Sequence, residues 1–216
     1  PECGHVLSAL DLVPVLSFVA SRGRCRHCHA RIPFRYPVTE LSCAVWAMLL
    51  YRQVGLGFDF PLLALWGFLL IALLWIDFDF QLLPDVLTFP GTLIGLAAAR
   101  QAPDGARHAI SGMAVGSGLL WLLAWGYLRL RKIEGMGGGD IKLAAMFGGV
   151  LGWKLTLLTL FLAALAGSVW GLALMARGRG DGRTALPFGT LLAPAAMVAF
   201  LWGPAAVSAY TRLWQR

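Results

Sequence analysis

Long runs of uncharged residues constrain this chain more than any other feature of its sequence. Five such runs cover 60–76, 86–99, 108–128, 155–176 and 184–211. A helix of about 20 apolar residues spans the hydrocarbon core of a bilayer, so three of these runs suffice outright and two lie near the limit. Only 13% of the residues are charged, whereas a soluble domain has about 25%. The sequence therefore predicts an all-α, polytopic membrane protein.

Shorter apolar stretches at 41–51 and 143–153 become spans only if their flanking residues are included. With them, the sequence predicts about seven transmembrane helices in a helical domain over residues 38–216. The expected spans are 38–54, 60–76, 86–99, 108–128, 141–152, 155–176 and about 186–202.

Residues 1–37 form the only sizeable polar segment and are predicted to be a small cytoplasmic domain. Cys25 and Cys28 form a CxxC, a spacing that lets two thiolates share one tetrahedral zinc ion, and Cys3 is a third candidate ligand. Free cytosolic thiols are the plain alternative, because disulfides are rare in that compartment. His5, His27 and His29 are further candidate ligands, whereas Cys43 lies in an apolar run and is expected to pack.

The basic residues indicate an orientation rather than a nucleic-acid partner. The formal net charge is +7. If the N-terminal segment is cytoplasmic and seven spans alternate, twelve of the 18 lysines and arginines lie inside. This excess follows the positive-inside rule.

On this topology four aspartates lie at the cytoplasmic ends of spans: Asp77, Asp79, Asp85 and Asp140. Asp85 begins a helix, where a carboxylate costs little. Asp77 instead follows an apolar run at a helix C-terminus, where the helix dipole disfavours negative charge, so something other than helix capping is expected to keep it there. Two carboxyl groups that meet can share a proton and hydrolyse a peptide. The same residue types also serve an ion or proton transporter.

The stretch EGMGGGDIKL, residues 134–143, places four glycines directly before Asp140. Glycine weakens a helix, so these residues are expected to keep Asp140 out of a continuous helix. They would also let an extended substrate backbone approach the carboxylate. A flexible inner loop that ends at an N-cap aspartate is the plain alternative.

Three segments resemble the prepilin peptidases, the bacterial type 4 leader peptidases. IDFDFQLLPDVLTFP (76–90) and EGMGGGDIKLAAMFGG (134–149) resemble the paired motifs of this family, and GRCRHCHARIPFRYPVTE (23–40) resembles its cysteine segment. The resemblance implies a GxGD-type intramembrane aspartyl protease whose catalytic pair is Asp77 and Asp140, with Asp79 as the rival for the first position. Residues with expected supporting roles are Glu134, Gly137, Gly139 and Lys142. Lys142 would act on the charge of Asp140 or extend to the membrane interface.

The resemblance also implies a reaction and a location. Members cleave the leader from prepilins or pseudopilins on the cytoplasmic side of the bacterial inner membrane, and many then methylate the new N-terminus with S-adenosylmethionine. The expected cofactors are zinc and this methyl donor, and the partners are the substrates and membrane lipid. Family members have eight spans and a further cysteine that would precede Pro1, so the chain is expected to begin inside a longer protein. An ion transporter and a non-enzymatic assembly scaffold remain the alternatives, and the sequence does not distinguish pilus, secretion or DNA-uptake substrates.

Overall fold

The computed structural model is helical. It describes residues 3–214 except His5, Leu7, 102–103, 133–135 and 179–186. Within these residues no strand forms, and the one β-bridge joins Arg24 to Arg31. The main helices are α2 (Arg35–Val54), α3 (Asp59–Phe80), α4 (Asp85–Ala98), α5 (Ala106–Arg131), α6 (Gly138–Ala176) and α7 (Gly189–Trp214). The short ones are η1 (Ala9–Leu12), α1 (Leu16–Ala20) and η2 (Ala99–Gln101). The all-α class is confirmed.

Four helices in the described part of the chain are long and apolar enough to cross a membrane, namely α3, α5, α6 and α7. The apolar helix α4 is shorter, and α2, with 20 residues, is long enough but is not apolar enough to be counted with these four. A polytopic helical membrane protein is therefore confirmed, and the count of seven spans stays a prediction. Large apolar side chains along α5, such as Trp121, Leu122 and Leu123, are about half exposed, as expected of a surface that faces lipid.

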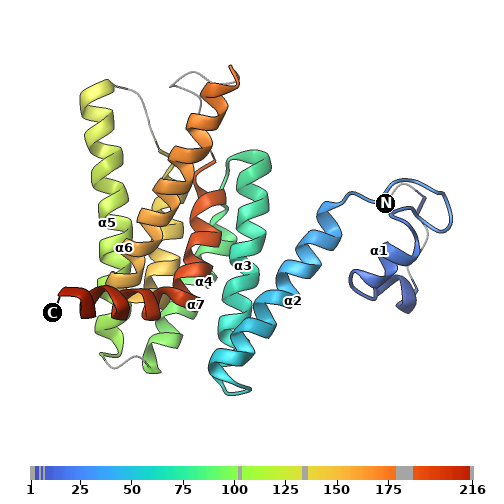
Figure 1. Cartoon of the computed structure of the whole chain (residues 1–216), viewed down its shortest axis with the longest axis horizontal. Coiled ribbons are helices and arrows are strands. Elements are labelled where there is room, and N and C mark those ends of the chain that lie inside the picture. Colours follow the sequence, from blue (N-terminus) through green and yellow to red (C-terminus); the bar gives the residue numbers. More distant parts are fainter. Residues whose placement is uncertain are drawn as a thin grey trace.

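Two spans that the sequence separates, 141–152 and 155–176, lie in the single element α6. The element contains a sharp break at Gly152, where φ is 67° and ψ is 171°. Positive φ favours glycine, and a methyl group at this position would also lie 2.6 Å from His108 Nε2. The break sends the two halves of α6 in different directions, so the expected turn at 152–154 is present as a kink (Figure 1).

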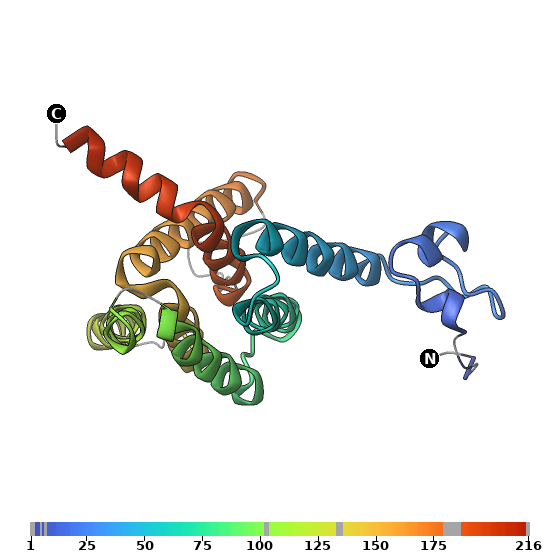
Figure 2. The ribbon, with the colours of Figure 1, turned by 90° about the horizontal axis from the view of Figure 1, so that it is seen from below.

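Helix α6 lies at the centre of the bundle and packs against α4, α5 and α7 (Figures 1 and 2). Helix α3 packs against α2, α4 and α7 on the other side. The rings of Trp46, Trp66 and Phe200 join α2, α3 and α7, with centroids 5.7 to 5.9 Å apart. Both tryptophans are buried. This packing fixes α3 and α7, whose cytoplasmic ends, on the expected topology, carry the site described below.

Small residues bring α5 and the first half of α6 into backbone contact. A methyl group on Gly112 would overlap the carbonyl oxygen of Gly148, and one on Gly116 would lie 2.8 Å from the carbonyl oxygen of Ala144. Close approach through glycine and alanine is typical of helix pairs in membranes, because lipid supplies no hydrophobic force between helices.

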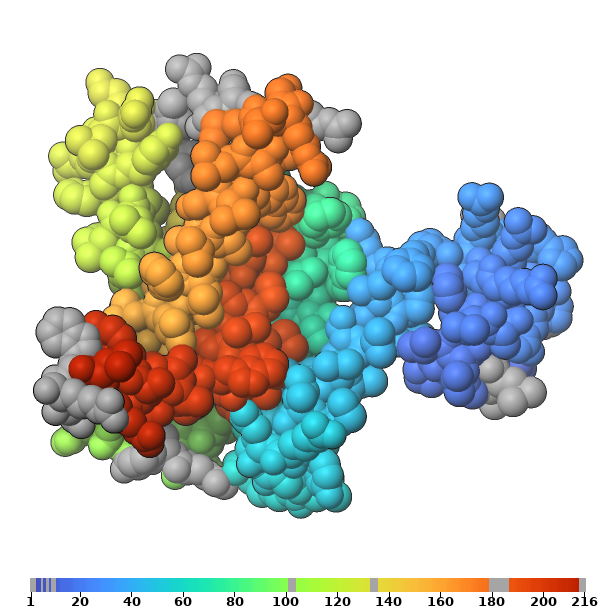
Figure 3. Space-filling model, in the orientation of Figure 1, coloured from blue at the N-terminus to red at the C-terminus, as the bar shows by residue number. Residues whose placement is uncertain are grey.

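The residues before α2 form a small body that projects from the bundle beyond the N-terminal end of α2 (Figures 1 and 3). Two contacts join it to α2. The backbone N–H of Val15 donates to Glu40 Oε2 at 2.8 Å, and the rings of Phe18 and Phe34 meet edge-on at 6.0 Å. Within the body, Asp11 pairs with Arg26 at 3.4 Å.

Candidate active site

Asp77 and Asp140 are both buried and belong to different helices. Asp77 lies in the last turn of α3 and is 5% exposed; Asp140 lies in the first turn of α6 and is 9% exposed. The two carboxyl groups are close enough to interact electrostatically. The structure thus brings together, from positions 63 residues apart, the two aspartates that the sequence analysis paired.

The side chain of Leu83 lies against two glycines, Gly139 and Gly189, beside this pair. A methyl group on Gly139 would lie 2.8 Å from Leu83 Cβ, and one on Gly189 would lie 3.0 Å from both Leu83 Cδ1 and Asp77 Cγ. The side chain of Leu83 is buried. The end of α3 and the starts of α6 and α7 therefore meet around Leu83. The two glycines allow this approach, because a side chain at either position would overlap the volume that Leu83 takes.

The start of α7 holds the Asp77 carboxylate. The backbone N–H of Thr190 donates to Asp77 Oδ2 at 2.6 Å, and the Thr190 hydroxyl donates to the same oxygen at 2.9 Å. The first N–H groups of a helix have no partner within it and carry partial positive charge. This contact compensates the unfavourable position of Asp77 at the end of α3. Because it caps the start of α7, the expectation that something other than helix capping keeps Asp77 there is wrong.

Asp140 has a different environment. Its Oδ1 is buried and has no hydrogen-bond partner among the described residues. Helix α6 begins at Gly138, and the backbone N–H of Asp140 donates to the carbonyl of Gly137 at 3.2 Å. The expectation that the glycines keep Asp140 out of a continuous helix is therefore wrong, because Gly139 and Asp140 both lie in a regular first turn. Gly137 alone is extended, with φ −73° and ψ 147°.

Asp79 faces a different partner from Asp77. Both terminal nitrogens of Arg35, at the start of α2, donate to its carboxylate, with Nη2 at 2.6 Å from Oδ1. The guanidinium of Arg35 also lies 4.6 Å from the ring centre of Trp75. Asp79 therefore joins α3 to α2, and no contact joins it to Asp140 among the described residues.

Lys142 contacts Asp85 rather than Asp140. Its Nζ donates to both carboxylate oxygens of Asp85, at 2.6 and 2.8 Å, and ties the start of α4 to α6. Both side chains are about half exposed. The expectation that Lys142 acts on Asp140 has no contact to support it, and Glu134 lies outside the described residues.

The three N-terminal cysteines come together. The sulfur atoms of Cys3, Cys25 and Cys28 all lie within 4.8 Å of one another, with Cys3 and Cys25 at 3.9 Å. Tetrahedral zinc with Zn–S bonds of about 2.3 Å separates its sulfur ligands by about 3.8 Å. The donor set and its spacing therefore fit three of the four ligands of a zinc ion. Cys43 packs against the core instead, as expected.

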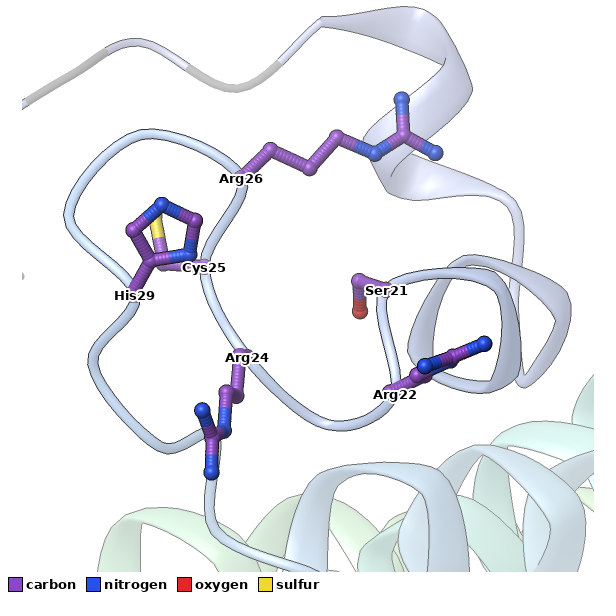
Figure 4. Close-up of a pocket in the computed structure, with 6 residues that line it drawn as sticks. All are labelled: Ser21, Arg22, Arg24, Cys25, Arg26 and His29. Atoms are coloured by element: carbon purple, nitrogen blue, oxygen red, sulfur yellow. The ribbon is translucent and has the colours of Figure 1, made fainter.

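The backbone around Cys25 favours its thiolate. Hydrogen bonds from the backbone of Cys28 and of His27 lower the pKa of the Cys25 thiol to about 7, and the thiolate is the form that binds metal. The pKa of Cys28 is raised despite a backbone hydrogen bond from Ala30, because its side-chain hydrogen bonds to Cys25 and Cys3 favour the thiol. Cys25 also borders a hollow whose other lining residues, shown in Figure 4, are Ser21, Arg22, Arg24, Arg26 and His29.

The sequence analysis missed Gly189 and Thr190 at the site, and Arg35 beside it. Gly189 and Thr190 lie near the start of the last uncharged run, and both residue types are favoured where a helix begins; this start lies on the expected cytoplasmic face. These residue types indicate where a helix begins, but they do not indicate which side chain of another helix this N-terminus contacts. Arg35 gave no signal that could link it to Asp79, 44 residues away.

Comparison with known proteins gives a consistent result. Residues 64–172 match the type IV leader peptidase family, and residues 1–54 match the Bacterial Peptidase A24 N-terminal domain. A prepilin leader peptidase/N-methyltransferase from Pseudomonas putida is 40% identical over 208 residues, which is 94% of this chain and 70% of that protein. The protein of the same name from Stutzerimonas stutzeri is 36% identical over 97% of this chain and 73% of its own length. No solved structure matches the chain significantly.

Proposed function

The chain belongs to the type IV leader peptidase family, and we propose that Asp77 and Asp140 are its catalytic pair. The observation that carries this proposal is the approach of these two buried carboxyl groups from different helices. Asp79, the alternative partner for Asp140, is engaged by Arg35.

The enzyme is a prepilin leader peptidase with N-methyltransferase activity, by its relatedness to the proteins of that name. This relatedness favours a hydrolytic role for the aspartates over an ion transporter or a non-enzymatic scaffold. S-adenosylmethionine, the donor that the methyltransferase name implies, would supply the methyl group for the new N-terminal amine.

The pair supplies what peptide hydrolysis needs. Two neighbouring carboxyl groups share one proton, so one of them takes a proton from water while the other donates to the substrate carbonyl oxygen. Water adds to the carbonyl carbon, the leaving amine is protonated, and the C–N bond of the leader breaks. Thr190 donates two hydrogen bonds to Asp77 Oδ2, so in this proposal Asp77 Oδ1 is the oxygen that contacts the water or Asp140. Gly137 leaves the backbone just before α6 without a side chain, where a substrate backbone would lie, whereas the space beside Gly139 is filled by Leu83.

The active site faces the cytoplasm in this proposal, and the helices lie in the bacterial inner membrane. Asp77 at the end of α3 and Asp140 at the start of α6 lie at helix ends that the alternating topology places inside, as do Arg129 and Arg131 in the last turn of α5. Residues 1–37 would form a cytoplasmic domain on the same side and residues 38–216 the membrane domain. Prepilins and pseudopilins would reach the site from the lipid, and no nucleic acid takes part.

The N-terminal segment would hold a structural zinc ion through Cys3, Cys25 and Cys28. The spacing of the three sulfur atoms supports this, and a fourth ligand would come from outside this group. Metal content of the purified protein, measured by mass spectrometry, tests it. Zinc near one equivalent, lost in Cys25→Ser but kept in Cys43→Ser, is the expected result; equal zinc in both variants would exclude the site.

Cleavage of a purified prepilin by the detergent-solubilised protein tests the catalytic pair. Asp77→Asn and Asp140→Asn should abolish leader removal, since asparagine cannot share the proton, and Asp79→Asn is the matched control on the same helix. Mass spectrometry of the pilin separates leader removal from methylation. Full cleavage by either the Asp77→Asn or the Asp140→Asn variant would refute the pair.

A further inference from the structure

We propose that Gly189 and Thr190, at the start of α7, are positioning residues that hold the Asp77 carboxylate in its reactive orientation. This proposal rests on the proposed catalytic role of Asp77. It makes the beginning of the last helix a third element of the active site, beside the end of α3 and the start of α6.

The contacts of Thr190 determine which oxygen of Asp77 is free. Its N–H at 2.6 Å and its hydroxyl at 2.9 Å both donate to Oδ2, and neither donates to Oδ1. Two donors to one oxygen fix the rotation of the carboxyl group about the Cβ–Cγ bond. In this proposal the second oxygen is the one left for the water that reacts between Asp77 and Asp140.

Gly189 lets α7 approach closely enough for these bonds. A methyl group at this position would lie 3.0 Å from Asp77 Cγ and 3.0 Å from Asp77 Oδ2. These distances are shorter than ordinary carbon contacts, so a side chain here would push the carboxylate away or lift the start of α7. Leu83 Cδ1, also 3.0 Å away, blocks the alternative direction of relief.

A purely structural role for this contact would have a different consequence. If Asp77 served only to cap α7, loss of a Thr190 donor would lower stability and leave the rate of chemistry unchanged. A positioning role lowers kcat instead, because a displacement of about 1 Å from the reactive geometry costs about 10²-fold in rate. The two roles are therefore separable by comparing kcat, KM and unfolding.

Paired variants at Thr190 give the test. Thr190→Val removes only the hydroxyl donor and keeps the shape, and Thr190→Ser restores it. A hydrogen bond to a charged group contributes about 1.5 to 3 kcal/mol, so Thr190→Val should lower kcat for prepilin cleavage about tenfold or more with KM unchanged. Thr190→Ser should recover most of this loss. Equal kcat in Thr190→Val and the wild type, or equal losses in both variants, would overturn the proposal.

Gly189→Ala provides an independent arm, with Gly126→Ala as its control. A methyl group on Gly126 of α5 meets nothing within 4 Å, so this variant should cleave normally. Gly189→Ala should lower kcat, by less than the about 10²-fold that a 1 Å displacement costs, because contacts of 3.0 Å are relieved by a shift of a few tenths of an ångström. Its unfolding temperature and its methylation of a pre-cleaved pilin should stay close to wild type. A fall of methylation and of unfolding temperature along with cleavage would indicate a packing role and overturn the proposal for Gly189.

The same assay separates this proposal from the catalytic assignment. Full cleavage by Asp77→Asn would refute the catalytic pair, and Gly189 and Thr190 would then have nothing to position. Loss of cleavage in Asp77→Asn, together with normal kcat in Thr190→Val and Gly189→Ala, would leave the pair intact and refute the positioning role alone.

Discussion

The contact between α5 and the first half of α6 gives a quantitative test of how this bundle is held together. Gly112 faces the carbonyl group of Gly148, and a methyl group at Gly112 would also lie 2.8 Å from Gly152 Cα. Backbone atoms cannot rotate away as a side chain can, so in Gly112→Ala the two helices must separate. Gly118, on the same helix, has nothing within 4 Å of the equivalent position, and Gly118→Ala is therefore the matched control.

The expected magnitudes follow from these surroundings. Overpacking of a rigid interface costs about 1–3 kcal/mol, and the upper part of this range applies because the opposing atoms are backbone. Alanine restores about 1 kcal/mol of helix propensity at either site. Gly112→Ala should therefore lower the free energy of unfolding by about 2 kcal/mol. Gly118→Ala should leave it unchanged or raise it by up to about 1 kcal/mol.

Unfolding can be followed by tryptophan fluorescence, since the chain has nine tryptophans, during titration of the detergent-solubilised protein with a denaturing detergent. Prepilin cleavage should fall together with stability in Gly112→Ala, because the displaced half of α6 begins with Asp140. Free energies of unfolding that agree within about 0.5 kcal/mol for the two variants, the spread of ordinary surface substitutions, would refute close backbone packing as the reason for these glycines.

Three further results are expected. Asp79→Asn should keep prepilin cleavage close to wild type and lower the free energy of unfolding by about 1 kcal/mol or less, because its ion pair is partly exposed; a loss of cleavage as large as that of an active-site variant would contradict this. Lys142→Met removes the ion pair between Lys142 and Asp85, whose side chains are 46% and 49% exposed, respectively. In a double-mutant cycle the coupling free energy between the two residues should be about 0–1 kcal/mol. A larger coupling would show that the pair is desolvated. In metal-free protein, the rate of alkylation of Cys25 should rise as the pH passes about 7, where its thiol ionises. Cys28 should react only at higher pH, because its pKa is raised. Peptide mass mapping that finds Cys28 alkylated at lower pH than Cys25 would contradict the described backbone hydrogen bonds.

Much of the architecture follows from the order of apolar runs. The run 108–128 lies within α5 (Ala106–Arg131), and the run 86–99 closely matches α4 (Asp85–Ala98). Length and hydropathy suffice here because a chain in lipid must satisfy its backbone hydrogen bonds within each helix. The expected separation of 141–152 from 155–176 also has its counterpart in the structure, because α6 consists of two helices that meet at the break at Gly152.

The aspartate pair shows where local patterns stop being informative. The resemblance to the paired motifs of the family indicated Asp77 and Asp140, but Asp79 remained a rival because a difference of two residues along a helix end has no reliable signature. The structure separates the two through Arg35, which binds Asp79 from a helix distant in sequence. Lys142 gives the converse case, since its place beside Asp140 in the sequence suggested a contact that Asp85 receives instead.

Local sequence therefore specified the class of protein, the approximate helices, the cysteine cluster and the two aspartates. These properties depend on hydropathy, residue type and short spacing, all of which act along the chain itself. Only the tertiary structure decided that the start of α7 meets Asp77 through Thr190, across 113 residues. That contact depends on how α3, α6 and α7 pack, and packing is a property of facing helix surfaces that no single segment encodes. In the proposed site, the orientation of Asp77 is thus set by a residue from the far end of the chain.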